Sequence, residues 1–189
     1  MKILVACEFS GVVREVFKAK GHDAWSCDLL ETEIPGQHIK GDVIDLLNEE
    51  WDLLIAHPPC TYISNMSNCR IKQPGRMDKR TEGMNFFMKF VNAPIEKIAI
   101  ENPRGLPERV YRKPDQIIQP FQFGHPVSKA TCLWLKNLPL LSPEKIVEPY
   151  RKFDGKRYRT WVDICKSHTS KYRSITFQGI AQALANQWG

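Results

Sequence analysis

Hydrophobic and polar positions along the chain predict strands that alternate with helices. Apolar, β-prone runs at residues 2–6, 22–27 and 52–56 predict buried strands, because parallel strands covered on both faces are apolar almost throughout. Between the first two runs, apolar residues recur at helical spacing from Val12 to Phe17. A strand, a helix and a second strand in this order are typical of the start of a doubly wound α/β domain.

The same alternation continues to the end of the chain. Further strands are predicted at residues 38–40, 95–100 and 131–135, helices at 82–92 and 176–188, and short helices at 43–49 and 115–121. Polar stretches without a period, at 61–81 and 104–114, are predicted to be loops. We therefore expect one α/β domain over residues 1–189, with a doubly wound, mainly parallel sheet and helices on both faces.

Composition is that of an ordinary soluble globular chain, with 42% hydrophobic and 25% charged residues. No apolar run approaches the length that spans a membrane, and Glu8 interrupts the first one too early for a signal peptide. We therefore expect a cytoplasmic protein with no membrane partner. The six cysteines form no C-x-x-C pair, so the sequence suggests neither a zinc site nor a disulfide framework.

The net charge of +6 is concentrated in two basic clusters, at residues 70–80 and 151–173. Such clusters suit a phosphate-bearing partner, although a run of charges is more often a solvated face. Aromatic residues interleave the second cluster between Tyr150 and Trp161, which favours nucleic acid over a purely solvating role.

Two neighbouring strands end in residues that can do chemistry. Pro58 and Pro59 cannot continue a central strand, because they lack the N–H that the ladder needs. Cys60 therefore follows a strand's carboxyl end, where ligands bind in open α/β sheets. The alternative is that Cys60 is a small buried filler. Glu101 follows the strand at 95–100, so both residues are expected at the rim of one pocket.

A thiol beside a carboxyl group suits one reaction better than hydrolysis. A carboxylate disfavours the thiolate, and no obvious partner completes a protease-like triad, although His57 is near in sequence. The pair does suit addition to an electron-poor pyrimidine. The thiolate adds to carbon 6 while the carboxyl group holds ring nitrogen 3 and the exocyclic amine, and carbon 5 then becomes nucleophilic enough to take a methyl group.

Acidic residues at the first strands are candidates for nucleotide binding. The turn after the first strand has only Gly11, without a G-x-G-x-x-G fingerprint. Asp28, just past the second strand, suits either ribose hydroxyls or a turn cap. Asp42 suits either the N-cap of the helix at 43–49 or a hydrogen bond from an adenine amino group.

Taken in order, these segments resemble the cytosine-C5 DNA methyltransferases, S-adenosylmethionine-dependent enzymes with a doubly wound, Rossmann-like class I fold. Residues 52–64 are similar to the family's nucleophile segment, in which Pro-Cys follows a strand and Ser closes the motif. Glu101-Asn102-Pro103 is similar to the family's Glu-Asn-Val segment. The resemblance implies that Cys60 is the nucleophile and that Glu101 is the catalytic carboxyl group.

The resemblance also implies a site for S-adenosylmethionine. Phe9, Ser10 and Gly11 are similar to the first part of the family's Phe-x-Gly-x-Gly-Gly cofactor loop. Asp28 matches the acidic residue that binds the cofactor's ribose. Asp42 matches the aspartate that meets the adenine, and Pro58 is expected beside the cofactor.

The chain departs from the family at several positions. Val12 and Val13 replace later glycines of the cofactor loop. Lys129-Ala130-Thr131 aligns with the family's Arg-x-Arg, so only Lys129 keeps a cation, where we expect it to help neutralise charge on the base. Residues 136–172 are a short basic insert where the family has a target-recognition domain, too short for a domain that folds alone.

We therefore expect a compact methyltransferase that acts on cytosine in DNA, either flipped from a duplex or presented on a single strand. Its sequence preference should be short or relaxed, or specificity should come from a homodimer or an accessory partner. One alternative is methylation of a free cytosine nucleotide or of RNA. Another is a catalytically silent relative that binds nucleic acid or the cofactor, against which the retained Cys60 and Glu101 argue.

Overall fold

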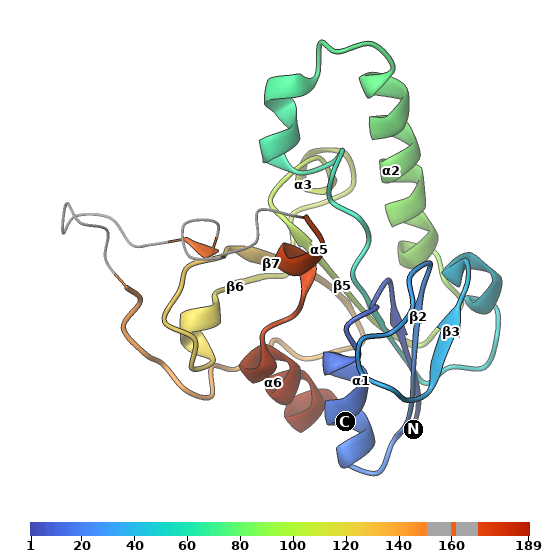
Figure 1. Cartoon of the computed structure of the whole chain (residues 1–189), viewed down its shortest axis with the longest axis vertical. Coiled ribbons are helices and arrows are strands. Elements are labelled where there is room, and N and C mark those ends of the chain that lie inside the picture. Colours follow the sequence, from blue (N-terminus) through green and yellow to red (C-terminus); the bar gives the residue numbers. More distant parts are fainter. Residues whose placement is uncertain (151–159, 162–169) are drawn as a thin grey trace.

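Seven strands form one sheet in the order β3-β2-β1-β4-β5-β7-β6 (Figure 1). The computed structural model describes residues 1–150, 160–161 and 170–189. In that part of the chain the strands are β1 (Lys2–Ala6), β2 (Asp23–Asp28), β3 (His38–Lys40), β4 (Leu53–Ala56), β5 (Lys97–Pro103), β6 (Gln116–Ile118) and β7 (Thr131–Lys136).

The sheet is mixed rather than wholly parallel. β1 to β5 pair in parallel, whereas β7 lies antiparallel between β5 and β6. The expected α/β fold with a mainly parallel sheet is thus confirmed in part. The short helix predicted at 115–121 is wrong: Gln116–Ile118 is strand β6, followed by the 3₁₀ turn η3 (Pro120–Gln122). Pairing with β7, and burial of Ile118, outweigh the weak local pattern.

Helices cover both faces of the sheet. Within the described residues they are α1 (Val12–Ala19), η1 (Val43–Leu46), η2 (Asn65–Arg70), α2 (Arg76–Val91), α3 (Pro107–Val110), α5 (Ser170–Ser174) and α6 (Gln178–Trp188). The loops predicted at 61–81 and 104–114 are therefore wrong in part, because they contain η2, the start of α2, and α3. None of the described helices is both long and apolar enough to cross a membrane.

Alternating side chains of the central strands feed two separate cores. On β1, Ile3 and Val5 pack in a cluster with residues of α1 and α6. Leu4 and Ala6 point the other way, into a cluster with residues of α2 and η1. α1 and α6 also contact each other, side by side on one face (Figure 1). Burial on both faces explains why the central strands are apolar throughout.

The direction of chain progression reverses between β1 and β4. β2 and β3 extend the sheet on one side of β1, and β4 and β5 on the other. Ala6 and Ala56 are paired across this point, so the two strands end side by side. Cys7, the next residue, has φ 58°, in the left-handed region that residues other than glycine seldom adopt. In open α/β sheets the crevice at such a reversal is where ligands bind.

The loop after β4 is fastened to the end of β5. β5 runs on through Pro103 rather than stopping before Glu101, because its last residues pair with β7. The Asn102 side chain donates to the Pro58 carbonyl at 2.7 Å. Further along, Leu106 N donates to the Ile63 carbonyl at 2.7 Å. Gly105 allows this approach, because a Cβ there would overlap the Ile63 carbonyl oxygen.

We predict that Gly105→Ala lowers the free energy of unfolding by about 1–3 kcal/mol, the usual cost of forcing extra atoms into a packed site. Urea unfolding followed by tryptophan fluorescence measures it. Gly41→Ala is the matched control, because a Cβ at Gly41 meets no atom within 4 Å. Equal unfolding midpoints for the two variants would contradict this close approach.

Candidate active site

Three polar side chains meet at one edge of the sheet, in a pocket beside α6. His57 follows β4, Glu101 lies in β5, and Lys129 precedes β7. The remaining lining is mainly apolar: Ile55, Ala99, Ile118, Thr131, Leu133, Thr176, Phe177, Ile180, Leu184 and Trp188. The pocket therefore presents a few polar groups at one end of an apolar wall that belongs to the core between the sheet and α6.

His57 and Glu101 form a direct hydrogen bond. Nδ1 of His57 lies 3.1 Å from Oε2 of Glu101, and the two side chains are only 8% and 22% exposed. Burial alone would raise the pKa of Glu101, but the hydrogen bond from His57 and the charge of Lys129 outweigh it, so the pKa lies below its usual value. Glu101 is therefore a carboxylate at neutral pH, and Nδ1 of His57 carries the shared proton.

The Glu101 carboxylate is close enough to Cys60 to change the pKa of its thiol. Burial and the Glu101 carboxylate raise the pKa of the Cys60 thiol, while Lys129 and Arg173 oppose the rise without cancelling it. The resting thiol is therefore protonated. The Cys60 carbonyl accepts hydrogen bonds from Ile63 N and Ser64 N, which fixes the turn that carries the sulfur.

Lys129 links the pocket to the C-terminal part of the chain. Its Nζ donates to the Arg173 carbonyl at 3.0 Å and lies 5.8 Å from the centre of the Phe177 ring. Its backbone N donates to Oε1 of Gln119. Lys129 therefore stands among groups from α5, the start of α6 and the β6–η3 turn, rather than in a direct ion pair with Glu101.

Asp28 and Asp42 lie at the carboxyl ends of the neighbouring strands β2 and β3. Each uses Oδ1 locally, to accept from Leu30 N at 2.9 Å and from Ile44 N at 3.0 Å. The turn-cap and N-cap interpretations are thus both confirmed, and no described residue donates to either Oδ2. Both carboxylates act on Cys27, whose pKa burial and these charges raise to about 11. The same causes raise the pKa of Cys7 further still.

The turn after β1 is organised by a residue that the sequence pattern did not single out. Glu8 is 4% exposed, and its carboxylate accepts from Val13 N at 2.6 Å and from the Ser10 hydroxyl at 3.2 Å. A carboxylate there also complements the positive N-terminal end of α1. Phe9 is buried beside it, with Lys171 Nζ 4.9 Å from the centre of its ring. An acidic residue between a strand and a helix is the signal that could have identified Glu8.

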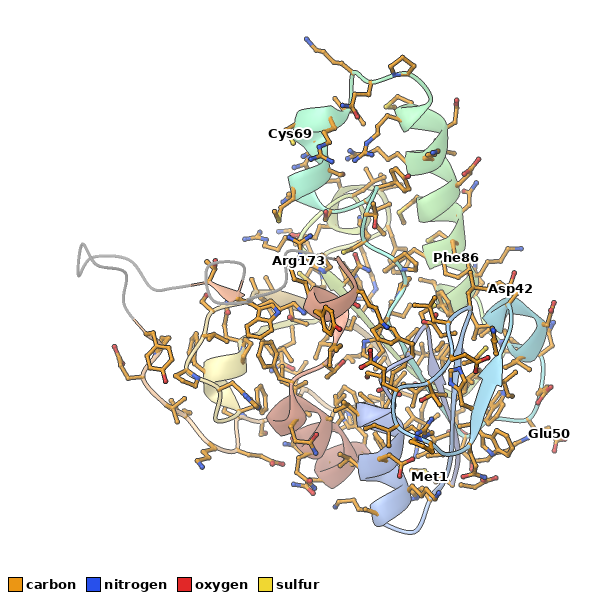
Figure 2. All side chains as sticks on the ribbon, viewed as in Figure 1. Met1, Asp42, Glu50, Cys69, Phe86 and Arg173 are labelled. Carbon is orange, nitrogen blue, oxygen red and sulfur yellow. The ribbon has the colours of Figure 1, made fainter. Side chains whose placement is uncertain are left out.

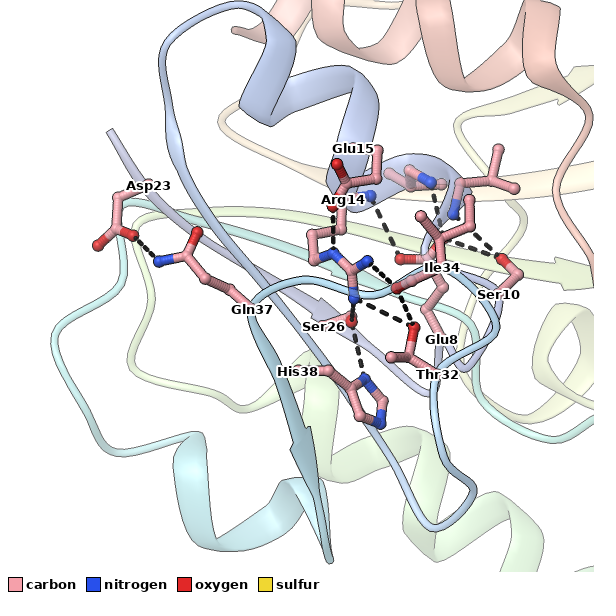
Figure 3. Close-up of polar contacts among 12 residues, drawn as sticks. Glu8, Ser10, Arg14, Glu15, Asp23, Ser26, Thr32, Ile34, Gln37 and His38 are labelled. Carbon is pink, nitrogen blue, oxygen red and sulfur yellow. Dashed lines mark hydrogen bonds and ion pairs between the residues drawn. The ribbon is translucent and has the colours of Figure 1, made fainter.

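Arg14 holds the loop that follows Asp28. Its guanidinium is fully buried and donates to the Ser26 and Thr32 hydroxyls and to the Ile34 carbonyl (Figure 3). Gly11 has φ 76°, and a Cβ there would lie 2.7 Å from an Arg14 nitrogen. Gly11 is therefore needed for packing against Arg14, whether or not a ligand also approaches it.

The structure thus gathers the predicted residues in two groups along one edge of the sheet. Glu101 and Lys129 line the pocket beside α6, and Cys60 lies close to Glu101 but outside this lining. The second group lies at the carboxyl ends of β1, β2 and β3: Phe9, Ser10, Gly11, Asp28 and Asp42. Pro58, buried and bonded to Asn102, starts the turn that leads from β4 to Cys60. Most of the second basic cluster, and aromatic residues such as Tyr158, lie outside the described residues.

The first basic cluster lies on η2 and α2, which project beyond the sheet at the top of Figure 1. Arg70, Lys72 and Lys79 are exposed. Figure 2 labels Cys69 at this projecting end and Asp42 beside the sheet, far from it. The Arg76 guanidinium lies 4.7 Å from the centre of the Tyr62 ring, and so ties α2 to the turn that follows Cys60.

Comparison with known proteins finds matches among solved structures only. No protein-family model matches the chain, and no curated protein matches it. One solved structure that matches is a candidate DNA modification methyltransferase encoded within a prophage of E. coli, with 17% identity and a TM-score of 0.48. The match covers 89% of this chain and 55% of the other, so the chain spans about half the length of that protein.

We predict that Glu101→Gln lowers the pKa of Cys60, because removing a nearby negative charge stabilises the thiolate. At pH 8, iodoacetamide should then alkylate Cys60 several-fold faster than in the unchanged protein, as followed by peptide mass spectrometry. Exposed Cys69, on η2, is the internal reference and should keep its rate. Equal Cys60 rates in the two proteins would contradict the electrostatic contact with Glu101.

Proposed function

We propose that the chain is an S-adenosylmethionine-dependent methyltransferase that acts on carbon 5 of cytosine in DNA. The observation that carries this proposal is that Cys60 follows β4 and Glu101 lies near the end of the adjacent parallel strand β5, with the carboxylate close enough to raise the pKa of the thiol. The ordered resemblance of five segments to cytosine-C5 methyltransferases supports the same chemistry.

In the proposed reaction Cys60 is the nucleophile. Its thiol gives up its proton as sulfur bonds to carbon 6, the 5,6 double bond of the ring shifts to carbons 4 and 5, and nitrogen 3 takes up a proton. Glu101 holds nitrogen 3 and the exocyclic amine, and so stabilises the charge that develops there. After carbon 5 has gained its methyl group it loses its own proton to water, nitrogen 3 gives back its proton, the carbon–sulfur bond breaks, and the thiol of Cys60 is restored.

The residues at the carboxyl ends of β1, β2 and β3 fit the cofactor. Asp28 and Asp42 each have one carboxylate oxygen that accepts no hydrogen bond from the described residues, so each can accept one from a hydroxyl or an amino group of a ligand. Phe9 and Ser10 line the start of the neighbouring turn, and Pro58 leads from the end of β4 towards Cys60. When bound, S-adenosylmethionine supplies the electrophilic methyl group.

DNA is the proposed substrate because the projecting basic cluster on η2 and α2 is joined to the turn that follows Cys60. Arg76 and Lys79 both lie against the Tyr62 ring, two residues after the nucleophile. Phosphates bound along this projection would bring a neighbouring base to the pocket, and the base must leave the stack for a thiol to reach carbon 6. A free nucleotide needs no such surface.

We further propose that residues 1–189 act as one methyltransferase domain. With only residues 136–172 in place of a target-recognition domain, few side chains remain to read base edges. Sequence preference is then short or relaxed, or it is contributed by a second copy of the chain or by an accessory protein.

A covalent adduct tests the nucleophile and the substrate together. DNA in which 5-fluorocytosine replaces cytosine should become bound to Cys60 in the presence of S-adenosylmethionine, because fluorine cannot leave as a proton does. Intact-mass and peptide mass spectrometry detect the product. Cys60→Ser should abolish it, whereas Cys69→Ser is the matched control and should form it normally.

Comparison of duplex DNA, single-stranded DNA, RNA and a free nucleotide, each carrying 5-fluorocytosine, identifies the substrate class. An adduct found only with RNA or with the nucleotide would overturn DNA as the substrate and leave the chemistry intact. An adduct that survives Cys60→Ser would remove Cys60 from its proposed role.

For the cofactor, we predict that Asp28→Asn weakens S-adenosylmethionine binding by about 1–3 kcal/mol, measured by calorimetric titration. The amide keeps an oxygen for Leu30 N but loses the charge that strengthens a hydrogen bond from the ligand. Asp52→Asn is the control: its carboxylate accepts from Lys2 N at the opposite edge of the sheet, and binding should not change. Equal affinity of both variants would contradict the proposed cofactor site.

A further inference from the structure

One ring nitrogen of His57 has a hydrogen-bond partner and the other has none among the described residues. Its Nδ1 is bonded to Glu101, but its Nε2 is buried and has no hydrogen-bond partner among the described residues. The side chain is 8% exposed and lines the pocket. A buried ring nitrogen without a partner is costly, and such groups are uncommon in folded proteins. Nε2 is therefore available to a ligand or to a water molecule in the pocket.

His57 is also the group that directly holds Glu101. Lys129, the one cation kept at the position aligned with Arg-x-Arg, gives its Nζ to the Arg173 carbonyl instead. Thr131, at the second arginine position, is buried and bonds to the Lys129 carbonyl. Among the described residues, Glu101 thus has its hydrogen-bond partner on the loop of the nucleophile, three residues before Cys60.

We propose that His57 is the positioning residue for Glu101: it fixes Oε2 and leaves Oε1 to face the base. This inference rests on the proposed function. It assigns a role to a side chain to which the resemblance of residues 52–64 to the nucleophile segment gives none.

The proton count closes with the thiol of Cys60. As sulfur bonds to carbon 6, the thiol proton passes to the Glu101 carboxylate, which His57 holds in place, and from there to nitrogen 3. When the carbon–sulfur bond breaks, this proton returns from nitrogen 3 to the sulfur by the same route, and the proton that carbon 5 loses after methylation goes to water. No other reactant is needed.

The charged and titratable groups that face this pair come from several elements. Cys60 lies on the same loop, Lys129 precedes β7, and Arg173 is at the end of α5. The lining residues of α6 and the segment before it carry no charge: Thr176, Phe177, Ile180, Leu184 and Trp188. Lys129 favours the Glu101 carboxylate by its charge but donates its Nζ hydrogen bond elsewhere, so His57 is the described side chain that fixes the orientation of Glu101.

The kinetic test uses His57→Ala and His57→Asn, with His22→Asn as the control, because His22 does not line the pocket. His57→Ala should slow adduct formation with 5-fluorocytosine DNA about 100-fold, the usual scale for a catalytic group that is misplaced by about 1 Å. The Kd values for DNA and S-adenosylmethionine should stay within about twofold. His57→Asn should recover part of the rate, because its amide can donate to Glu101. A His57→Ala rate equal to that of the unchanged protein would overturn the proposal, as would His57→Asn being no faster than His57→Ala.

A second measurement needs no activity. A ring N–H that donates to a carboxylate gives a downfield proton signal in NMR, and the His57 signal is assigned from its loss in His57→Asn. In Glu101→Gln this signal should move upfield, because a neutral amide is a weaker acceptor than a carboxylate. An unchanged signal would contradict this inference whatever the activity. A signal that responds in this way, together with no adduct on any substrate, would instead contradict the proposed function.

Discussion

The chain must leave the sheet directly after β4, and the arrangement of the site depends on where it is then held. Pro58 and Pro59 cannot take part in the ladder as donors, so the backbone turns away. The Asn102 side chain, 1% exposed, captures the Pro58 carbonyl and joins the turn to the end of the adjacent strand. Because Glu101 precedes Asn102 in the same strand, one buried hydrogen bond brings the candidate nucleophile loop and the candidate carboxylate together.

Different contacts stabilise the turn after β1 and the loop after β2, where we propose that the cofactor binds. Glu8 caps α1 from within the turn, and the buried Arg14 guanidinium binds the loop after β2 (Figure 3). These internal contacts stabilise the connection from β1 to α1. The connection therefore does not need glycines at positions 12 and 13, where the chain has Val12 and Val13. Lys171 of α5 then bonds to Glu33 in the loop after β2 and lies over Phe9, so the C-terminal part of the chain also contacts this end.

Long apolar patterns were enough to predict most of the elements, because central strands buried on both faces leave a clear signal. β1, β2, β4, α1 and α6 were all predicted to within a few residues. β6 was missed, since a three-residue edge strand has no pattern of its own and forms only by pairing with β7. The start of α2 was missed because its first turns are exposed and polar, and so show no apolar period.

Site residues at or near the ends of strands could be predicted from the sequence. Site residues whose role depends on a contact between distant segments could not. Cys60 and Glu101 stand at strand ends that can be located from the sequence. The bond from His57 to Glu101 spans 44 residues, and nothing local distinguishes His57 from a histidine that ends a strand on the surface. The burial of Arg14 could not be predicted either, because its partners Thr32 and Ile34 lie in a loop whose sequence has no hydrophobic periodicity.

The central claim concerns which atom of which base receives the methyl group. Duplex DNA incubated with the protein and S-adenosylmethionine that carries a deuterated methyl group can be digested to nucleosides and analysed by liquid chromatography with mass spectrometry. We predict that the label appears as 5-methyldeoxycytidine, and that none appears with Cys60→Ser. Label in an N-methylated cytosine or adenine would contradict the account, because methylation of an amino group needs no thiol that adds to the ring.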